Sequence, residues 1–193
     1  MASDSSAATR DQVVSFDSEE LILVNENDDE VGHLDKSSCH DGDGVLHRAF
    51  SLFIFNARGE LLLQQRSGGK RLWPLYWSNS CCSHPRRGET MEQAIHRRLK
   101  QELGVDAELK YLYRFQYSAQ YEDLGSEREL CWVYAGRCDA QPKINRLEIE
   151  DWRFVTPATL EAELETSPER YTPWFKMEWK RITKEFAGAV EHL

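Results

Sequence analysis

Long hydrophobic runs and an excess of positive charge are both missing from this sequence of 193 residues. No apolar segment approaches the roughly 20 residues that a membrane-spanning helix needs. The first ten residues, MASDSSAATR, have no hydrophobic core of the kind found in secretion signals. The formal net charge of −9 argues against a general nucleic-acid-binding protein. These absences predict a cytoplasmic protein that binds neither membranes nor nucleic acids.

Cysteine is also scarce: the chain has five, of which Cys81 and Cys82 are adjacent. This set does not resemble the paired cysteines of a secreted disulfide framework, so free thiols in a reducing compartment are expected. Hydrophobic residues make up 40% of the chain and aromatic residues 11%, which predicts a folded globule rather than a disordered chain. The sequence does not determine the oligomeric state, and a monomer is the expected form.

Hydrophobic periodicity predicts an α+β fold in which a mixed sheet is sandwiched between helices. The expected strands cover residues 21–24, 31–34, 47–56, 60–66, 107–117, 129–137 and 149–155. The expected helices cover residues 89–105, 158–165 and 173–187. Residues 1–18 are predicted to be a flexible tail, and residues 19–193 a single domain.

Three details of this pattern bear on the architecture. Residues 47–56 are apolar on both faces, which is typical of a central strand that is covered on both sides. A turn at residues 57–59 is expected to join this strand to residues 60–66 in a hairpin. Residues 37–44 and 67–74 are rich in glycine and polar residues and are predicted to be loops.

The most unusual segment is SNSCCSHP at residues 78–85, which precedes the helix expected over residues 89–105. Gly104 stands where the C-terminal cap of this helix belongs. At the helical repeat, Arg98 and Glu102 fall on the same face as the apolar residues of the helix. A charged pair on a buried face costs stability unless the protein uses it, so this pair indicates a functional site.

Three histidines and two glutamates form a candidate metal site. His40 lies in a predicted loop, His47 begins the central strand, and His84 follows the adjacent cysteines. Glu127 and Glu129 are two residues apart in a strand, so their side chains share one face. Such a set would suit Mn²⁺, Mg²⁺ or Zn²⁺. Because solvated side chains are the commoner explanation for residues of these types in such places, the metal site is at this point a hypothesis.

Other residues offer further chemistry. The thiol of Cys82 is a candidate for reactivity if His84 lies on the same side, although free cysteine is more often a small buried hydrophobe. Cys81 faces the other way and fits packing better. A basic loop and a set of aromatic residues could hold a phosphate or diphosphate and stabilise a cation, and solvated and core roles remain open for them. These residues are Lys36, Arg66, Lys70, Arg71, Trp73, Trp77, Tyr117, Trp174 and Phe175.

Taken together, these motifs resemble type I isopentenyl diphosphate isomerase, a family of the Nudix superfamily. The matching segments are SCCSHP at residues 80–85, LQQRS at 63–67, RRLKQELG at 97–104 and TPWF at 172–175, with His40 and His47 upstream and Glu127-x-Glu129 downstream. The resemblance extends from about Leu21 to the C-terminal helix. It implies that the chain converts isopentenyl diphosphate to dimethylallyl diphosphate through a tertiary carbocation.

The resemblance also implies a role for each matched residue. It assigns the first metal site to His40, His47, His84, Glu127 and Glu129. It assigns a second Mg²⁺, which arrives with the substrate diphosphate, to Glu102 and the main-chain carbonyl of Cys82. The remaining diphosphate charge is assigned to Lys36, Arg66, Lys70 and Arg98. Cys82 and Glu129 are implied as the acid and base in an order left open, with Tyr117 assisting Glu129 and Trp174 covering the cation.

Two alternatives compete with this interpretation. The helix resembles a degenerate Nudix box in which Glu89, Arg97, Glu102 and Gly104 remain, so a Nudix-type diphosphate hydrolase is the first alternative. Ser83, Arg98 and Gln101 replace the leading glycine and two glutamates of the hydrolase pattern, which weighs against hydrolysis. The second alternative is a non-catalytic metal or redox module based on Cys81 and Cys82.

Overall fold

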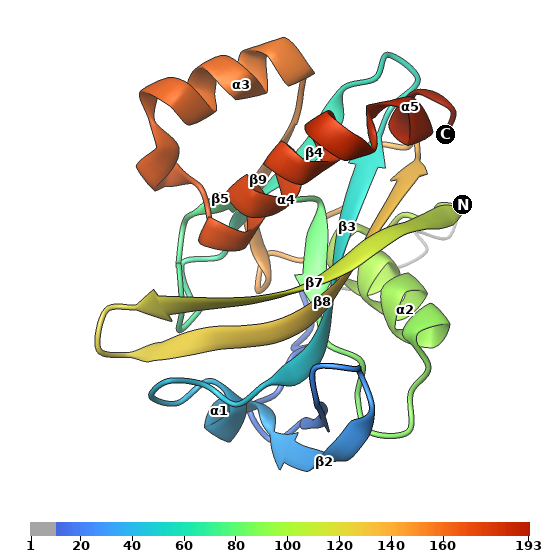
Figure 1. The fold of residues 1–193 in the computed structure, drawn as a ribbon. Helices are drawn as coiled ribbons and strands as arrows, with labels where there is room; N and C mark the ends of the chain where they lie inside the picture. The colour runs from blue at the N-terminus through green and yellow to red at the C-terminus, as the bar shows by residue number, and fades with distance from the viewer. Residues whose placement is uncertain (1–10) are drawn as a thin grey trace, which may run out of the picture.

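Strand β3 (His47–Phe55) is the centre of the sheet in the computed structural model, which describes residues 11–193 (Figure 1). It pairs in antiparallel fashion with three strands and in parallel with a fourth. The antiparallel partners are β1 (Glu20–Val24), β4 (Leu61–Arg66) and β6 (Cys81–Ser83), and the parallel partner is β8 (Gly125–Arg137). Segments distant in the sequence therefore meet along one strand.

The other strands extend the sheet outward from these partners. They are β2 (Glu30–Asp35) beside β1, β7 (Leu109–Tyr121) beside β8, and β5 (Trp77–Ser78) and β9 (Ile149–Val155) beside β4. The helices are α1 (Lys36–Cys39), α2 (Met91–Leu103), α3 (Pro157–Thr166), α4 (Pro173–Glu185) and α5 (Ala187–Glu191), with a 3₁₀ turn at Pro168–Arg170. The predicted α+β fold, a mixed sheet between helices, is confirmed.

Alternating residues of β3 supply two hydrophobic cores. Phe50, Leu52 and Ile54 pack with the apolar face of α2, whereas Phe53 and Phe55 pack with α4. Helices α2 and α4 accordingly lie on opposite sides of the sheet (Figure 1). The prediction of a central strand covered on both faces is confirmed. His47, the first residue of this strand, is therefore placed by a strand that is packed on both faces.

Helix α2 has the boundaries that its sequence dictates. The Thr90 hydroxyl accepts a hydrogen bond from the backbone of Gln93, whose side chain accepts one from the backbone of Thr90 in return, so the helix begins with a capping box. Gly104 ends it with a φ of 64°, a left-handed conformation that glycine adopts without strain. Arg98 and Glu102 are 2% and 3% exposed, which confirms that a charged pair lies on the buried face.

Some predicted elements differ from the observed ones. The predicted loop 37–44 contains part of α1, a helix too short to show a period, which forms because the Asp35 carboxylate accepts a hydrogen bond from the Ser38 backbone. The segment 78–85 contains the second residue of the short strand β5 and all of β6. The expected hairpin of β3 and β4 is joined only at Phe55 and Leu61, since β4 pairs along its length with β9.

The predicted tail falls partly outside the described residues, since the structure describes only residues 11–18 of it. In that part, the carbonyl of Val14 accepts a 2.9 Å hydrogen bond from Arg98, and the carbonyl of Gln12 accepts one of 2.7 Å from Asn145. The boundary between tail and domain at residue 19 stays a prediction. Among residues 11–193, no helix combines the length and the apolar character needed to cross a membrane.

Candidate active site and metal centre

The three histidines and two glutamates singled out in the sequence converge at one end of β3. His40 directly follows α1, His47 is the first residue of β3, and His84 directly follows β6. Glu127 and Glu129 come from β8, in which Glu129 is the register partner of His47. Their candidate ligand atoms all lie within 4.8 Å of one another, and all five side chains are buried. The five residues are far apart in the sequence, and the pairing of β3 with β6 and β8 brings them together.

Backbone carbonyls orient two of the imidazoles. The Nδ1 atom of His40 lies 2.6 Å from the carbonyl of Lys36, and the Nδ1 atom of His47 lies 2.7 Å from the carbonyl of Val45. In this arrangement each Nδ1–H donates to a carbonyl, which makes each Nε2 the atom available to a metal. Both Nε2 atoms point toward the glutamates, as metal ligands do.

The donor atoms of the cluster are suited to a divalent cation. Nε2 of His40 lies 2.9 Å from a Glu127 oxygen, and Nε2 of His84 lies 2.8 Å from Oε1 of Glu129. Nε2 of the fully buried His47 has no hydrogen-bond partner among the described residues, and its nearest carboxylate oxygen is 3.7 Å away. A buried polar atom without a partner is costly, and a metal ion would satisfy it. The residues therefore fit a metal.

The electrostatics of the cluster agree with this fit. Burial, together with neighbouring His47 and His40, holds the pKa of His84 well below its usual value, so this imidazole is neutral. Burial would lower the pKa of His40, but the carboxylate of Glu127 raises it to about 9. Burial would raise the pKa of Glu129, but the imidazole of His47 and the hydroxyl of Tyr117 keep it below its usual value. In the absence of a metal, His40 therefore holds a proton that it shares with Glu127, and a bound cation would take the place of this proton.

A close backbone approach fixes the loop that carries His40. The amide of Ser126 donates a 3.0 Å hydrogen bond to the carbonyl of His40. Gly125 precedes it with a φ of 152°, and a Cβ atom at this position would lie 2.2 Å from that carbonyl oxygen. Only glycine fits here, so the first two residues of β8 hold His40 close to the glutamates of the same strand.

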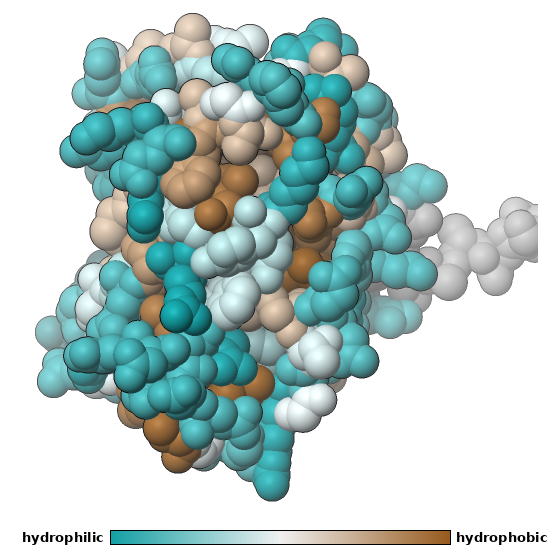
Figure 2. Space-filling view, turned by 45° about the vertical axis from the view of Figure 1, so that its right-hand side comes forward, coloured by the Kyte–Doolittle hydropathy of each residue, from teal (hydrophilic) through white to brown (hydrophobic). Residues whose placement is uncertain are grey.

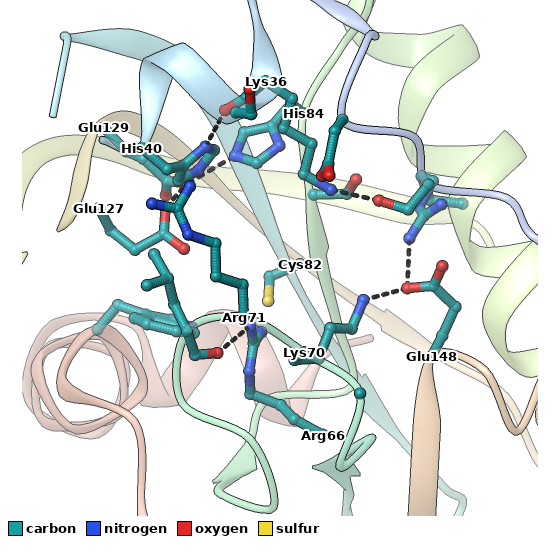
Figure 3. Close-up of a pocket in the computed structure, with 18 of the residues that line it drawn as sticks. Lys36, His40, Arg66, Lys70, Arg71, Cys82, His84, Glu127, Glu129 and Glu148 are labelled. Atoms are coloured by element: carbon teal, nitrogen blue, oxygen red, sulfur yellow. Dashed lines mark hydrogen bonds and ion pairs between the residues drawn. The ribbon is translucent and has the colours of Figure 1, made fainter. Parts of the chain in front are cut away.

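A cavity of about 300 Å³ adjoins the cluster, within the range of small-molecule sites. Cys82 lines it, and in Figure 3 its sulfur lies between the histidine–glutamate cluster and the Lys70–Glu148 pair. Burial raises the pKa of Cys82 to about 12, partly offset by Arg66, so the group is a thiol at neutral pH. Cys81, in contrast, is fully buried in the core that contains α2.

Tyr117 and Trp174 also line this cavity. The Tyr117 hydroxyl donates a 2.6 Å hydrogen bond to Oε2 of Glu129, and burial together with Glu129 raises its pKa well above the usual value. The Trp174 ring lies 6.2 Å from the Tyr117 ring, measured between centroids. The guanidinium of Arg66 lies 5.3 Å from the Trp174 ring centroid, close enough for a cation–π contact. An aromatic wall thus stands beside the cluster.

The other end of the cavity is cationic. It is lined by Lys36, Arg66, Lys70 and Arg98, the four residues that the resemblance assigns to the diphosphate. Burial lowers the pKa of Lys36, and the positive charges of Lys70 and Arg98 lower it further. Arg71, the remaining member of the basic loop, instead pairs with Asp41 and donates a 2.7 Å hydrogen bond to the Leu124 carbonyl.

The remnants of the Nudix box are engaged in ion pairs. Arg97 donates hydrogen bonds of 2.6 and 2.7 Å to the two oxygens of Glu89. Glu102 forms a buried ion pair with Arg98 and is not among the described residues that line the cavity. Glu102 is thus occupied by Arg98 in this structure, and a role with Mg²⁺, which stays a prediction, would require Arg98 to release it.

Two acidic residues escaped the sequence analysis. Glu148, which directly precedes β9, lines the cavity and pairs with Lys70 and Arg98. Glu178 of α4 is fully buried, with Oε1 3.6 Å from the sulfur of Cys131. Glu148 lies outside the periodic residues of a strand or helix, so no sequence pattern indicated its role. Glu178 lies four residues after Trp174, one helical turn away, and this spacing could have indicated that it faces inward.

Comparisons with known proteins agree with this geometry. The family model for the NUDIX domain matches residues 45–175. The solved structure of DR0079 from Deinococcus radiodurans superposes with a TM-score of 0.70 at 27% identity, covering 84% of this chain and 98% of that one. A MutT protein from Methanosarcina mazei superposes with a TM-score of 0.59 at 19% identity, covering 72% of this chain and 94% of that one, a likeness of fold. The chain therefore has the fold of a Nudix protein.

Curated relatives show to which family of Nudix proteins the chain belongs. Isopentenyl-diphosphate Delta-isomerase 1 of Photorhabdus laumondii is 44% identical over 166 residues, which cover 85% of this chain and 94% of the relative. Isopentenyl-diphosphate Delta-isomerase of Klebsiella pneumoniae is 40% identical, over 83% of this chain and 88% of the relative. The chain belongs to the isopentenyl-diphosphate Delta-isomerase family of the Nudix superfamily. The resemblance noted in the sequence is confirmed.

Proposed function

We propose that this protein isomerises isopentenyl diphosphate to dimethylallyl diphosphate. The observation that carries the proposal is the placement of Cys82 and the Tyr117–Glu129 pair in one cavity, which is also lined by the four cationic side chains assigned to the diphosphate. The reaction adds a proton to the terminal alkene carbon, which leaves a tertiary carbocation, and removes a proton from the carbon on its other side. The diphosphate is unchanged, and no oxidant or water is consumed.

Proton transfer in this proposal belongs to Cys82 and Glu129. One of them donates a proton to the alkene and the other accepts a proton from the cation, and they exchange roles in the reverse direction. Tyr117 supports Glu129 by donating a hydrogen bond to its carboxylate, so the proton that these two groups share lies at the cavity wall. The thiol of Cys82 supplies the second group, from a different strand of the sheet.

The carbocation needs protection from water, which would convert it to an alcohol. The ring of Trp174 is 2% exposed and lines the cavity, and its π face is suited to stabilise a cation. In the structure Arg66 occupies this place near the ring, which indicates that a positive charge is accommodated there. Substrate would draw Arg66 toward the diphosphate and leave the ring to the cation.

The proposed metal ligands are His40, His47, His84, Glu127 and Glu129. The mixed imidazole and carboxylate donors suit Mn²⁺, Mg²⁺ or Zn²⁺. Such an ion would withdraw electron density from Glu129 and make a proton shared with Tyr117 more acidic. The chain itself supplies the orientation, through the carbonyls that fix the imidazoles of His40 and His47.

Diphosphate binding is proposed for the cationic end of the cavity. Lys36, Arg66, Lys70 and Arg98 would neutralise charge on the phosphate oxygens. Glu102 and the main-chain carbonyl of Cys82 would hold the Mg²⁺ that enters with the substrate, since Mg²⁺ prefers hard oxygen ligands. This needs Arg98 to exchange its partner Glu102 for the diphosphate.

The decisive experiment is incubation of the purified protein with isopentenyl diphosphate and Mg²⁺, followed by analysis of the product. The allylic isomer is expected, and its absence from metal-loaded protein would contradict the proposal. The hydrolase alternative predicts phosphate release from nucleoside diphosphate derivatives. We expect none, because Glu89 is held by Arg97 and an arginine stands at position 98 in place of a glutamate.

The proposal includes a cytoplasmic monomer whose residues 19–193 form one domain and whose partner is the small isoprenoid diphosphate. On the face shown in Figure 2, hydrophobic side chains form small separated patches among hydrophilic ones, which supports the monomer. Sedimentation at micromolar concentration tests this, and a stable dimer would contradict it. The five cysteines, all in the described part of the chain, are free thiols, which does not support the redox-module alternative.

A further inference from the structure

Glu148 is a buried carboxylate whose place at the cationic end of the cavity calls for an explanation. The residue is 4% exposed, and its Oε2 atom forms an ion pair with Nζ of Lys70 and lies 3.3 Å from Nη2 of Arg98 (Figure 3). One carboxylate oxygen therefore contacts two of the four cations proposed to bind the diphosphate. A carboxylate at an anion-binding site opposes the anion by direct Coulomb interaction, so its presence implies another benefit.

Glu148 reduces the repulsion between positive charges that lie close together. Burial and the charges of Lys70 and Arg98 together lower the pKa of Lys36, so the three cations interact through a poorly solvated space. Like charges at such a site repel one another and would turn toward solvent in the absence of substrate. Glu148 offsets this repulsion because it is the acidic partner of Lys70 and shares Arg98 with Glu102.

Backbone hydrogen bonds hold Glu148 in place. Its carbonyl accepts a 3.0 Å hydrogen bond from the amide of Ser67, at the start of the loop that carries Lys70. Its own amide donates a 3.0 Å hydrogen bond to the carbonyl of Asn145, whose amide in turn donates one of 2.8 Å to the carbonyl of Glu102. The carboxylate is thereby anchored to the loop of Lys70 and to the last turn of α2, the helix that carries Arg98.

We propose that Glu148 is a positioning residue that holds Lys70 in the orientation in which it receives the diphosphate and keeps Arg98 beside it. Glu148 does not itself bind the substrate. It acts mainly through Lys70, because Arg98 has a second acidic partner in Glu102. This inference rests on the proposed function, since it assumes that the cationic end of the cavity holds a diphosphate.

The test is the binding of inorganic diphosphate with Mg²⁺, measured by calorimetry for the unaltered protein and for Glu148→Gln. Positioning predicts that the variant binds about tenfold more weakly, the typical effect of losing one charge-assisted contact. Simple charge opposition predicts the reverse sign. Equal or tighter binding by Glu148→Gln would therefore overturn the inference. In turnover, the KM for isopentenyl diphosphate is expected to rise while kcat changes little.

Two further variants separate positioning from a general structural effect. In a Lys70→Met background, Glu148→Gln is expected to change the affinity by less than about threefold, because the two residues act as one unit. A full tenfold loss in that background would contradict action through Lys70. Glu150→Gln is the matched control, since Glu150 is an exposed glutamate two residues further along, and it should bind diphosphate as the unaltered protein does.

The outcomes also distinguish this inference from the proposed function. If the unaltered protein binds no diphosphate, the proposed function fails and the inference fails with it. If it binds diphosphate and Glu148→Gln binds equally well, only the inference fails. Should Glu148→Gln not fold, Glu148→Asp keeps the charge but shortens its reach; weaker diphosphate binding by this variant would support positioning, and unchanged binding would overturn it.

Discussion

The hydroxyl of Tyr117 donates a 2.6 Å hydrogen bond to Oε2 of Glu129, from the neighbouring strand of the β7–β8 ladder. Because Tyr117 is proposed to share a proton with this carboxylate, Tyr117→Phe should lower kcat by roughly 10²-fold, the lower end of general acid–base effects, and leave KM nearly unchanged. Steady-state kinetics measure both constants. Tyr121→Phe, on the same strand, is the control that should retain activity, and an undiminished kcat for Tyr117→Phe would contradict its role.

Cys82 lines the cavity as a protonated thiol. Cys82→Ala removes the transferable proton, so the rate of allylic product formation should fall by about 10²- to 10⁴-fold while the fold is retained. Product analysis by chromatography gives the rate, and far-ultraviolet circular dichroism reports the fold. Cys138→Ala alters a half-buried cysteine that is not among the residues lining the cavity, and it should behave as the unaltered protein. Full activity in Cys82→Ala would remove the thiol from the mechanism.

The histidine–glutamate cluster should bind one divalent ion per chain. His84→Ala removes a buried ligand, so metal content after dialysis should fall well below one equivalent, whereas His96→Ala, at an exposed histidine of α2, should keep it. A ligand at 100 times its dissociation constant stabilises the folded state by about 2.7 kcal/mol. A chelator should therefore lower the free energy of unfolding of the unaltered protein by a similar amount. Unchanged metal content in His84→Ala would exclude this site.

Glu178 should make stability depend on pH. Burial raises its pKa to about 8, against 4.5 in the unfolded chain. Between these values the unfolded state has released the proton and the folded state has kept it, so the free energy of unfolding falls as pH rises, with a limiting slope of roughly 1 kcal/mol per pH unit. Glu178→Gln has no carboxyl group at this position and therefore lacks this contribution to the pH dependence of stability. Its stability relative to the unaltered protein should increase from pH 5 to pH 8.

Urea unfolding of both proteins at several pH values tests this prediction. The exposed Glu185→Gln variant, on the same helix, provides the control and should follow the unaltered protein at every pH. A stability difference between Glu178→Gln and the unaltered protein that stays constant with pH would show that Glu178 is ionised in the folded state.

The fold could be predicted where the sequence carries a local period. Helix α2, with its Gly104 cap and its buried Arg98 and Glu102, follows from the spacing of apolar residues along a single segment. The central strand follows in the same way, because both of its faces are apolar. Helix α1 was missed because four residues cannot show a period, and its start depends on one side chain, that of Asp35.

The candidate site could be predicted only in part. Residue types indicated a metal, yet nothing local shows that His40 lies 2.9 Å from Glu127, because the strand pairing of distant segments decides it. Family resemblance supplied that connection before the structure did. Neither the residue types nor the family resemblance indicated Glu148. Its importance arises from contacts with Lys70 and Arg98, which lie on other segments of the chain.

The register that sets His47 opposite Glu129 has a consequence for synthesis of the chain. All three imidazoles leave the ribosome before either carboxylate, because 42 residues separate His84 from Glu127 in the sequence numbering. A nascent chain that ends before β8 has the histidines without their acidic partners and lacks the strand that aligns them. The complete set of five ligands therefore exists only after the parallel ladder closes, a non-local step that is slow in folding. We therefore expect the five-ligand site to bind a metal ion only after the β3–β8 pairing has formed.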